Sequence, residues 1–138
     1  MHSPDKTQSL ISSTALIDAL RRIIPAGSVL FEKEDLMPYE CDGLSAYRAI
    51  PLAVVLAETI EQVQQVLMLC HKHQVPVVAR GAGTGLSGGA LPHEQGVLLS
   101  LAKFTNIIDI NPKRRVATVQ PGVRNLAISQ AADQYGLY

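Results

Sequence analysis

The 138-residue chain contains no tryptophan, and only 4% of its residues are aromatic. So few rings argue against a surface on which nucleic-acid bases stack. No charge of one sign is in excess either, because 12 Lys and Arg balance 12 Asp and Glu. A neutral chain is not expected to bind nucleic acid through a basic surface, so we predict no nucleic-acid partner.

Cysteines are scarce, and long apolar runs are absent. Cys41 and Cys70 lie far apart, without a CxxC motif or the Cys/His spacing of a metal site, so we predict no metal. No stretch approaches the roughly 18 apolar residues of a membrane span. The polar start, residues 1–6, lacks the order of a secretory signal. These features together predict a cytoplasmic protein with no membrane span.

What the sequence does contain is an apolar fraction of 47%, which is typical of a globular protein, at a length typical of one domain. The neutral total hides two unequal halves. Residues 1–70 carry 5 basic and 9 acidic side chains, whereas residues 71–138 carry 7 basic and 3 acidic ones. This division indicates that the second half faces an anion; the alternative is a dipolar surface with no ligand.

The first half reads as a helix and connector followed by a strand–helix–strand unit. Apolar spacing predicts a helix over 13–24, capped by Ser12 or Ser13, and then a short strand at 29–31. The acidic connector 32–50 would be anchored by Tyr39 and Tyr47. An unbroken apolar run predicts a buried strand at 51–56. A helix at 60–74, capped by Thr59, and a strand at 77–79 would complete a βαβ crossover with a parallel pair.

The second half predicts a further strand, a hairpin and a last helix. The strand is expected at 96–101, and the hairpin strands at 107–110 and 116–119 around an Asn-Pro turn at 111–114. The last helix is expected at 123–135, with Gly136 as its C-cap. The chain ends where another strand would begin, so we interpret it as a fragment or a truncated form.

A glycine-rich loop follows the strand at 77–79, with five glycines in residues 81–89. Ordering so many glycines is costly, and a flexible loop is the plainer alternative. Glycines allow successive N–H groups to converge on phosphate oxygens, so the loop is suited to a diphosphate. Thr84 and Ser87 add hydroxyl groups, and Arg80 adds charge.

Two common phosphate motifs do not fit this loop. A P-loop would need Lys followed by Ser or Thr directly after its last glycine, and this loop has no such pair. A Rossmann fingerprint needs a helix after the glycines and an acidic residue beyond it, but Gly88, Gly89 and Pro92 interrupt any helix. A nucleotide module using NAD is therefore a weaker alternative. The loop is predicted to run from strand to strand, with backbone amides providing most of the anion contacts.

Residues 77–90 resemble the FAD diphosphate loop of the FAD-linked oxidase family, which has the vanillyl-alcohol oxidase or p-cresol methylhydroxylase fold. The strand at 51–56 with its helix is similar to the family's opening βαβ, and Pro121-Gly122 is similar to the Pro-Gly after its hairpin. Residues 39–47 and 120–128 resemble the members that oxidise 2-hydroxy acids of the glycolate and D-lactate type.

The resemblance implies an α+β fold: a βαβ opening and a mixed small sheet with flanking helices, forming the first half of the FAD-binding domain. We divide the chain into a loose N-terminus (1–12), a helix and connector (13–50), and a truncated first FAD-binding subdomain (51–138). The implied cofactor-binding residues are the following: Arg80, Gly81, Ala82, Gly83, Thr84, Gly85, Leu86, Ser87, Gly88, Pro121 and Gly122.

The resemblance also implies a reaction and partners. Flavin would take a hydride from a small 2-hydroxy acid, and electrons would pass to an iron–sulfur partner subunit. Some members attach FAD covalently through a His at the position of Thr84, so non-covalent FAD is expected here. The family's catalytic residues lie in a later part of the polypeptide that this sequence does not include, so we assign none. We expect this chain alone to be inactive. The alternative is an inert binding module, for which a homodimer is one expected assembly.

Several other residues carry two interpretations each. Arg80 either serves the loop, by pairing with phosphate or by local support, or ends a strand at the surface. Arg124 faces either the cofactor or solvent. Residues 113–115 form either a solvated hairpin tip or a contact with a partner subunit. His93 is expected in an exposed turn, and Cys41 and Cys70 are expected to be a loop thiol and a core thiol.

Overall fold

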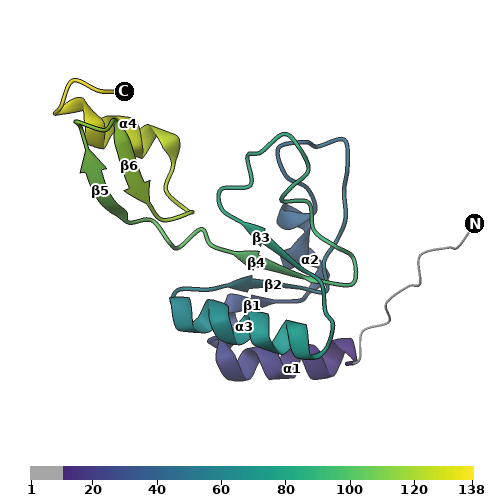
Figure 1. Ribbon diagram of the computed structural model, residues 1–138. Helices are drawn as coiled ribbons and strands as arrows, with labels where there is room; N and C mark the ends of the chain where they lie inside the picture. The colour runs from purple at the N-terminus through teal and green to yellow at the C-terminus, as the bar shows by residue number, and fades with distance from the viewer. Residues whose placement is uncertain (1–10) are drawn as a thin grey trace, which may run out of the picture.

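A four-stranded sheet of order β1-β2-β4-β3 forms the centre of the main body in the computed structural model, which describes residues 11–138 (Figure 1). The predicted loose N-terminus, 1–12, lies outside the described residues except for its last two positions. β1 is antiparallel to β2, whereas β2 and β3 both run parallel to β4. The strands are β1 (Val29–Leu30), β2 (Ala53–Leu56), β3 (Val77–Arg80) and β4 (Val97–Ser100).

The order of the strands corrects one expectation. The two strands of the predicted βαβ unit are parallel but do not pair, because β4 lies between them and Leu98 stands beside both Val54 and Val78. All four residues of β4 are buried, whereas β3 is partly exposed. The most completely buried strand therefore lies between the two others that it pairs with, where both of its faces are covered.

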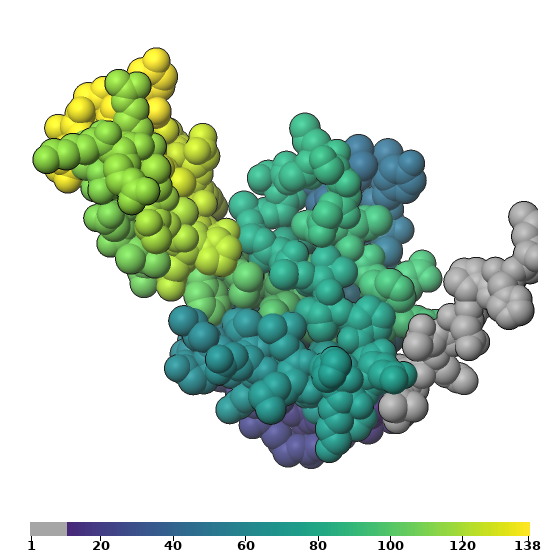
Figure 2. Space-filling view, viewed as in Figure 1, coloured from purple at the N-terminus to yellow at the C-terminus, as the bar shows by residue number. Residues whose placement is uncertain are grey.

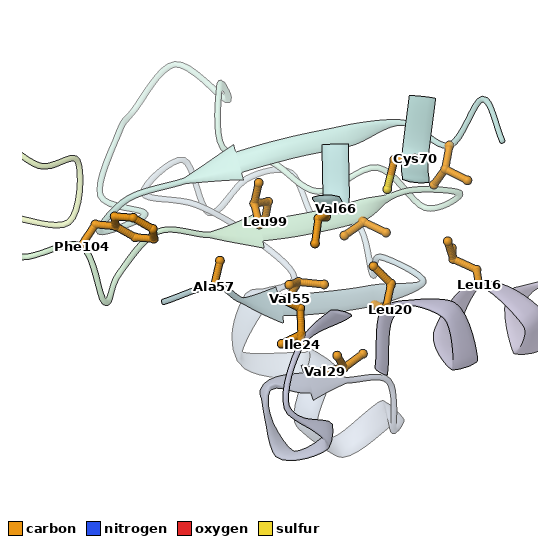
Figure 3. Packing of buried hydrophobic residues seen from close by; sticks show 13 residues of the cluster. Leu16, Leu20, Ile24, Val29, Val55, Ala57, Val66, Cys70, Leu99 and Phe104 are labelled. Carbon is orange, nitrogen blue, oxygen red and sulfur yellow. The ribbon is translucent and has the colours of Figure 1, made fainter. Parts of the chain in front are cut away.

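Helices cover one face of this sheet, as Figure 1 shows for α1 (Ser13–Ile23) and α3 (Ile60–Lys72). Leu20 of α1 and Val66 of α3 are fully buried and belong to one apolar cluster with Val55 and Leu99 of the sheet (Figure 3). Cys70 lies in the same cluster, and burial raises the pKa of its thiol to about 11. The prediction of a core thiol is confirmed for Cys70.

The opposite face is covered by the connector. Leu36 of the short helix α2 (Lys33–Leu36) packs with Val54 and Leu98, and the 3₁₀ turn η2 (Met37–Tyr39) follows it. Another 3₁₀ turn, η1 (Ala26–Ser28), leads into β1. Tyr39 packs against this cluster as expected. Tyr47 is 62% exposed, so its predicted anchoring role is wrong; it ends a surface turn in which its N–H donates to the Leu44 carbonyl.

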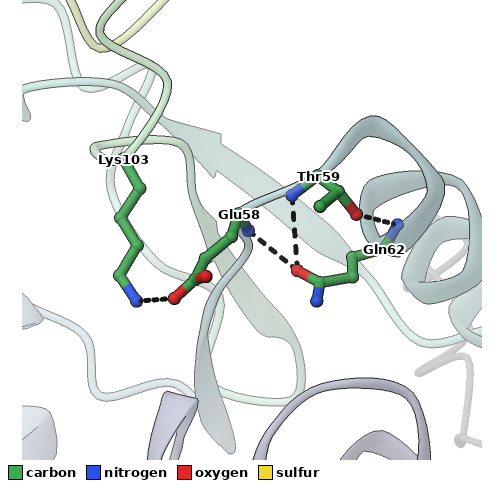
Figure 4. Close-up of polar contacts among 4 residues, drawn as sticks. All are labelled: Glu58, Thr59, Gln62 and Lys103. Atoms are coloured by element: carbon green, nitrogen blue, oxygen red, sulfur yellow. Dashed lines mark hydrogen bonds and ion pairs between the residues drawn. The ribbon is translucent and has the colours of Figure 1, made fainter.

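Both predicted N-caps are present. The Ser12 hydroxyl accepts from Ala15 N–H, which decides between the two serines. The Thr59 hydroxyl accepts from Gln62 N–H while the Gln62 side chain accepts from Thr59 N–H, a capping box drawn in Figure 4. α3 ends two residues earlier than predicted, since Gln74 has a left-handed φ of 54° and Pro76 follows.

The remaining elements form a separate lobe, seen beside the main body in Figures 1 and 2. β5 (Ile107–Asn111) and β6 (Val116–Val119) make the predicted hairpin, with a bulge between Ile107 and Asp109. The Asn111 side chain accepts from Arg114 N–H in the turn. α4 (Asn125–Asp133) is shorter than predicted at both ends. Gly136 closes it with φ 68° and donates to the Asp133 carbonyl, as the predicted C-cap should.

Within residues 11–138, no helix has the length and apolar character needed to cross a membrane. In the same part of the chain, no three His, Cys, Asp or Glu side chains gather into a group that could hold a metal ion.

Candidate functional site

A cleft of about 1150 Å³ opens at the carboxyl ends of the parallel strands. Leu56, Arg80 and Ser100 are the last residues of β2, β3 and β4, stand in register, and all line it. The other wall comes from the start of the C-terminal lobe, including Gly122 and Asn125. Figure 2 shows the hollow between this lobe and the main body. The carboxyl edge of parallel strands is where open α/β sheets bind ligands.

The structure brings the two predicted binding segments together. Five predicted residues line the cleft, namely Arg80, Gly81, Ala82, Thr84 and Gly122. Six others are not among its lining residues: Gly83, Gly85, Leu86, Ser87, Gly88 and Pro121. Of these, Leu86 is 73% exposed at the outer part of the loop. The predicted set is therefore split between the cleft wall and the loop that rises above it.

Two of the predicted glycines are required by the chain's own packing. A Cβ on Gly81 would lie 2.5 Å from the Pro121 carbonyl oxygen, and one on Gly122 would lie 2.5 Å from that of Leu101. Gly122 N–H also donates to the Phe104 carbonyl. These contacts fix the Pro-Gly turn against the first residue of the glycine loop. The two segments thus form one wall in which no larger side chain fits.

A third glycine shows how the connector reaches the site. A Cβ on Gly43 would lie 2.6 Å from the Thr84 carbonyl oxygen and 2.7 Å from that of Gly85. The connector backbone therefore rests directly on the glycine loop. The sequence analysis missed this contact, although Gly43 after Asp42 was a visible signal of close backbone approach.

Gly85 and Gly89 are different, because nothing in the chain requires glycine there. Neither has a left-handed φ, and a Cβ at either position would meet no atom within 4 Å. Both are exposed, and neither is among the residues that line the cleft. Such positions fit a loop whose backbone a ligand approaches closely, as a diphosphate does.

Arg80 forms its hydrogen bonds with backbone carbonyls of the protein itself. Its Nη2 donates to the Ala90 carbonyl at 2.7 Å and to the Tyr39 carbonyl at 3.3 Å, so it ties both ends of the loop region to the connector. Only 7% of the residue is exposed, and its Nε has no partner. Burial lowers the pKa of Arg80, and the Asp42 charge partly counteracts this. The burial excludes a strand end at the surface, and the two hydrogen bonds favour loop support over phosphate pairing.

Asp42 is the acidic counterpart of this buried arginine. It is 6% exposed, its Oδ1 accepts from Leu44 N–H at 2.8 Å, and its Oδ2 is buried without a partner. The two side chains make no direct ion pair, so Asp42 acts on the Arg80 charge only at longer range.

The cleft is positively charged although the chain is neutral. Its lining residues include Arg80, Lys103 and Arg124 but no Asp or Glu. Arg124 is also the N-cap of α4, without a side-chain cap, where a helix favours an anion. All three cations belong to the second half of the chain, which the charge pattern predicts to face an anion.

Sequence reasoning missed much of the wall. The missed lining residues include Leu56, Ser100, Lys103, Thr105 and Asn125. The last residue of each parallel strand was a usable signal for Leu56 and Ser100. Some other residues discussed in the sequence analysis do not line the cleft. His93 is exposed, and its Nδ1 accepts from Gln95 N–H. Residues 113–115 are exposed at the hairpin tip.

Comparison with known families decides the assignment: a family described as "FAD binding domain" matches residues 51–138. The chain belongs to this FAD-binding domain family. FAD is therefore its cofactor, as predicted.

The relatives of this FAD-binding chain are flavoenzymes. It is 59% identical over 128 residues to glycolate oxidase subunit GlcD of Escherichia coli K12, covering 93% of this chain and 26% of the relative. It is 34% identical to D-2-hydroxyglutarate dehydrogenase of Stutzerimonas stutzeri, covering 93% of this chain and 28% of that one. The chain spans about a quarter of the length of the curated relatives it matches.

Solved structures share the fold. A crystal structure of p-cresol methylhydroxylase with substrate bound has a TM-score of 0.74 and 30% identity, covering 90% of this chain and 25% of its own. The 4-ethylphenol oxidase of Gulosibacter chungangensis has a TM-score of 0.77 and 25% identity. The match covers 99% of this chain and 27% of that chain. The predicted α+β fold of the p-cresol methylhydroxylase type is confirmed.

Proposed function

We propose that this chain is the N-terminal FAD-binding portion of an oxidoreductase that acts on small 2-hydroxy acids. The 59% identity to a glycolate oxidase subunit over 93% of the chain carries this proposal. The positive cleft beside the glycine loop supports it, because it suits an anionic dinucleotide. We assign the oxidation itself to the complete polypeptide.

The eleven predicted residues fall into three groups, and we propose a role for each. Backbone N–H groups of residues 81–88 would bind the diphosphate, and Pro121-Gly122 would hold the loop and border the cofactor. Arg80 would act as the support of the loop. Thr84 stands where a covalent His occurs in some relatives, so FAD would bind without a covalent bond. When bound, the flavin supplies redox chemistry by accepting a hydride from the substrate.

The remaining assignments follow the same proposal. Residues 51–138 would be the first FAD-binding subdomain, with 13–50 as its helix and connector. Electrons would leave through an iron–sulfur partner subunit; a homodimer is the alternative assembly. The free thiols Cys41 and Cys70 support a reducing compartment, the cytoplasm.

Purification of the complete polypeptide that carries this chain tests the proposal. The protein should be yellow, release FAD on denaturation, and reduce a dye when given glycolate or D-lactate. A colourless polypeptide that takes up no FAD would contradict the proposal and favour an inert binding module.

A glycine substitution tests the loop. Gly85→Ala should weaken FAD binding by about tenfold, because the added methyl would overpack the cofactor rather than the protein. Gly27→Ala is the matched control, since a Cβ there also meets no atom within 4 Å and Gly27 lies in η1, away from the cleft. Equal FAD affinity in both variants would remove residue 85 from the site.

A further inference from the structure

Two ion pairs occur among the described residues, and only one of them borders the cleft. Glu58, just after β2, pairs with Lys103, just after β4 (Figure 4). The other pair joins Glu40 to Arg48 at 2.7 Å, and neither residue lines the cleft. The first pair therefore links the ends of two strands at the site itself.

Lys103 has a distinct position among the three cleft cations. The Arg80 guanidinium is buried and bound to two carbonyl groups. Arg124 is exposed and makes no ion pair with the described residues. Lys103 lines the cleft, yet its charge is compensated by a carboxylate that is not among the lining residues.

We infer that Lys103 binds the anionic part of the cofactor and that Glu58 restrains it, so this ion pair sets the affinity of the cleft. The inference rests on the proposed function of the cleft and deepens it. It assigns Lys103 as a binding residue and Glu58 as a positioning residue that opposes binding.

The two partners differ in how they are held. Glu58 precedes the capping box, and its backbone N–H donates to the Gln62 side chain at 2.8 Å, which holds its backbone at the start of α3. Lys103 carries its ammonium on a flexible four-carbon stem. The ammonium can therefore turn towards an anion in the cleft without any movement of the Glu58 backbone.

The ion pair is also weak enough for an anion in the cleft to replace the Glu58 carboxylate at Lys103. The two side chains are 44% and 49% exposed, so solvent screens their attraction. A diphosphate offers more negative charge than one carboxylate, in a cleft that has no acidic lining residue. An anion in the cleft can therefore displace Glu58 from Lys103.

A double-mutant cycle on the apo form of the complete polypeptide tests this inference, with FAD and ADP as probes. Glu58→Gln should tighten binding by about two- to fivefold, since the ligand no longer competes for the lysine. Lys103→Gln should weaken binding by about tenfold, and Lys103→Arg should restore most of it. In the Lys103→Gln background, Glu58→Gln should have no further effect. The differences should shrink as salt rises.

The controls separate this role from a structural one. Glu40→Gln breaks the other ion pair and should leave FAD affinity unchanged. If the Glu58–Lys103 pair only joined two strand ends, Glu58→Gln would weaken binding or leave it unchanged, which overturns the inference while the proposed function stands. A wild-type polypeptide that binds no FAD contradicts the proposed function instead.

Discussion

Arg80 illustrates how a side chain beside a binding loop can serve the loop rather than the ligand. Arg80→Met keeps most of the stem but leaves the Tyr39 and Ala90 carbonyls without their donor. The free energy of unfolding should fall by about 2 kcal/mol, measured by urea denaturation. Arg48→Met, which removes one exposed ion pair, should cost less than about 1 kcal/mol. If Arg80→Met abolished FAD binding at unchanged stability, the phosphate interpretation would be restored.

The sequence predicts residue roles well only where the partners are local. Ser12, Thr59 and Gly136 act within their own helix ends, and all three predictions are confirmed. The partners of Arg80 lie 10 and 41 residues away, so nothing near it in the sequence could reveal them. At Gly43 the glycine itself was visible in the sequence, but the carbonyls that it meets belong to the distant loop and were not.

At the scale of elements, the capping box of α3 supplies the clearest prediction. Thr59→Ala removes the acceptor of Gln62 N–H, and should lower the free energy of unfolding by about 1 kcal/mol. Thr14→Ala makes the same change at an exposed position inside α1, where alanine's helix propensity should stabilise by a few tenths of a kcal/mol. Urea titrations of the two variants should therefore shift in opposite directions; a shift in the same direction would contradict the capping role.

The positions of the strands could be predicted from local sequence, whereas their pairing and the exact ends of the helices could not. Apolar runs and turn residues located every strand and the hairpin. β4 lies between β2 and β3, and it is the strand whose residues are all buried. The spacing of apolar residues along the chain does not show which of these three strands is buried most completely, so it could not predict this order. The extent of α4 was overestimated because its apolar pattern continues past the turns at both ends.

At the scale of the whole molecule, burial is uneven. Both apolar clusters consist of residues up to Phe104, and Ala132 is the one buried hydrophobic residue beyond it. Ile108, Val116 and Leu126 in the C-terminal lobe are more than half exposed. A two-stranded hairpin with so little core is marginal. The charge asymmetry predicted an anion-facing half at 71–138, but no pattern indicated that β5, β6 and α4 would form a separate lobe.

Hydrogen exchange by mass spectrometry should reveal this difference. In the 138-residue chain, amides of β5, β6 and α4 should exchange well before those of β2 and β4, because local opening of the lobe exposes little apolar surface. Adding FAD should slow exchange in the lobe if its wall takes part in binding. Equal protection of lobe and sheet without ligand would contradict the uneven burial.

The central position of β4 has a consequence for the order in which the chain folds. β2 and β3 have no hydrogen bonds with each other, so β3 joins the sheet only through a strand that follows it in the chain. During synthesis, residues 29–80 can form their helices and the short β1–β2 ladder, but the sheet stays divided until residues 97–100 arrive. The glycine loop must close before that insertion is complete. Formation of the cofactor loop and completion of the core are thus a single late event, with the slow kinetics that non-local pairing entails.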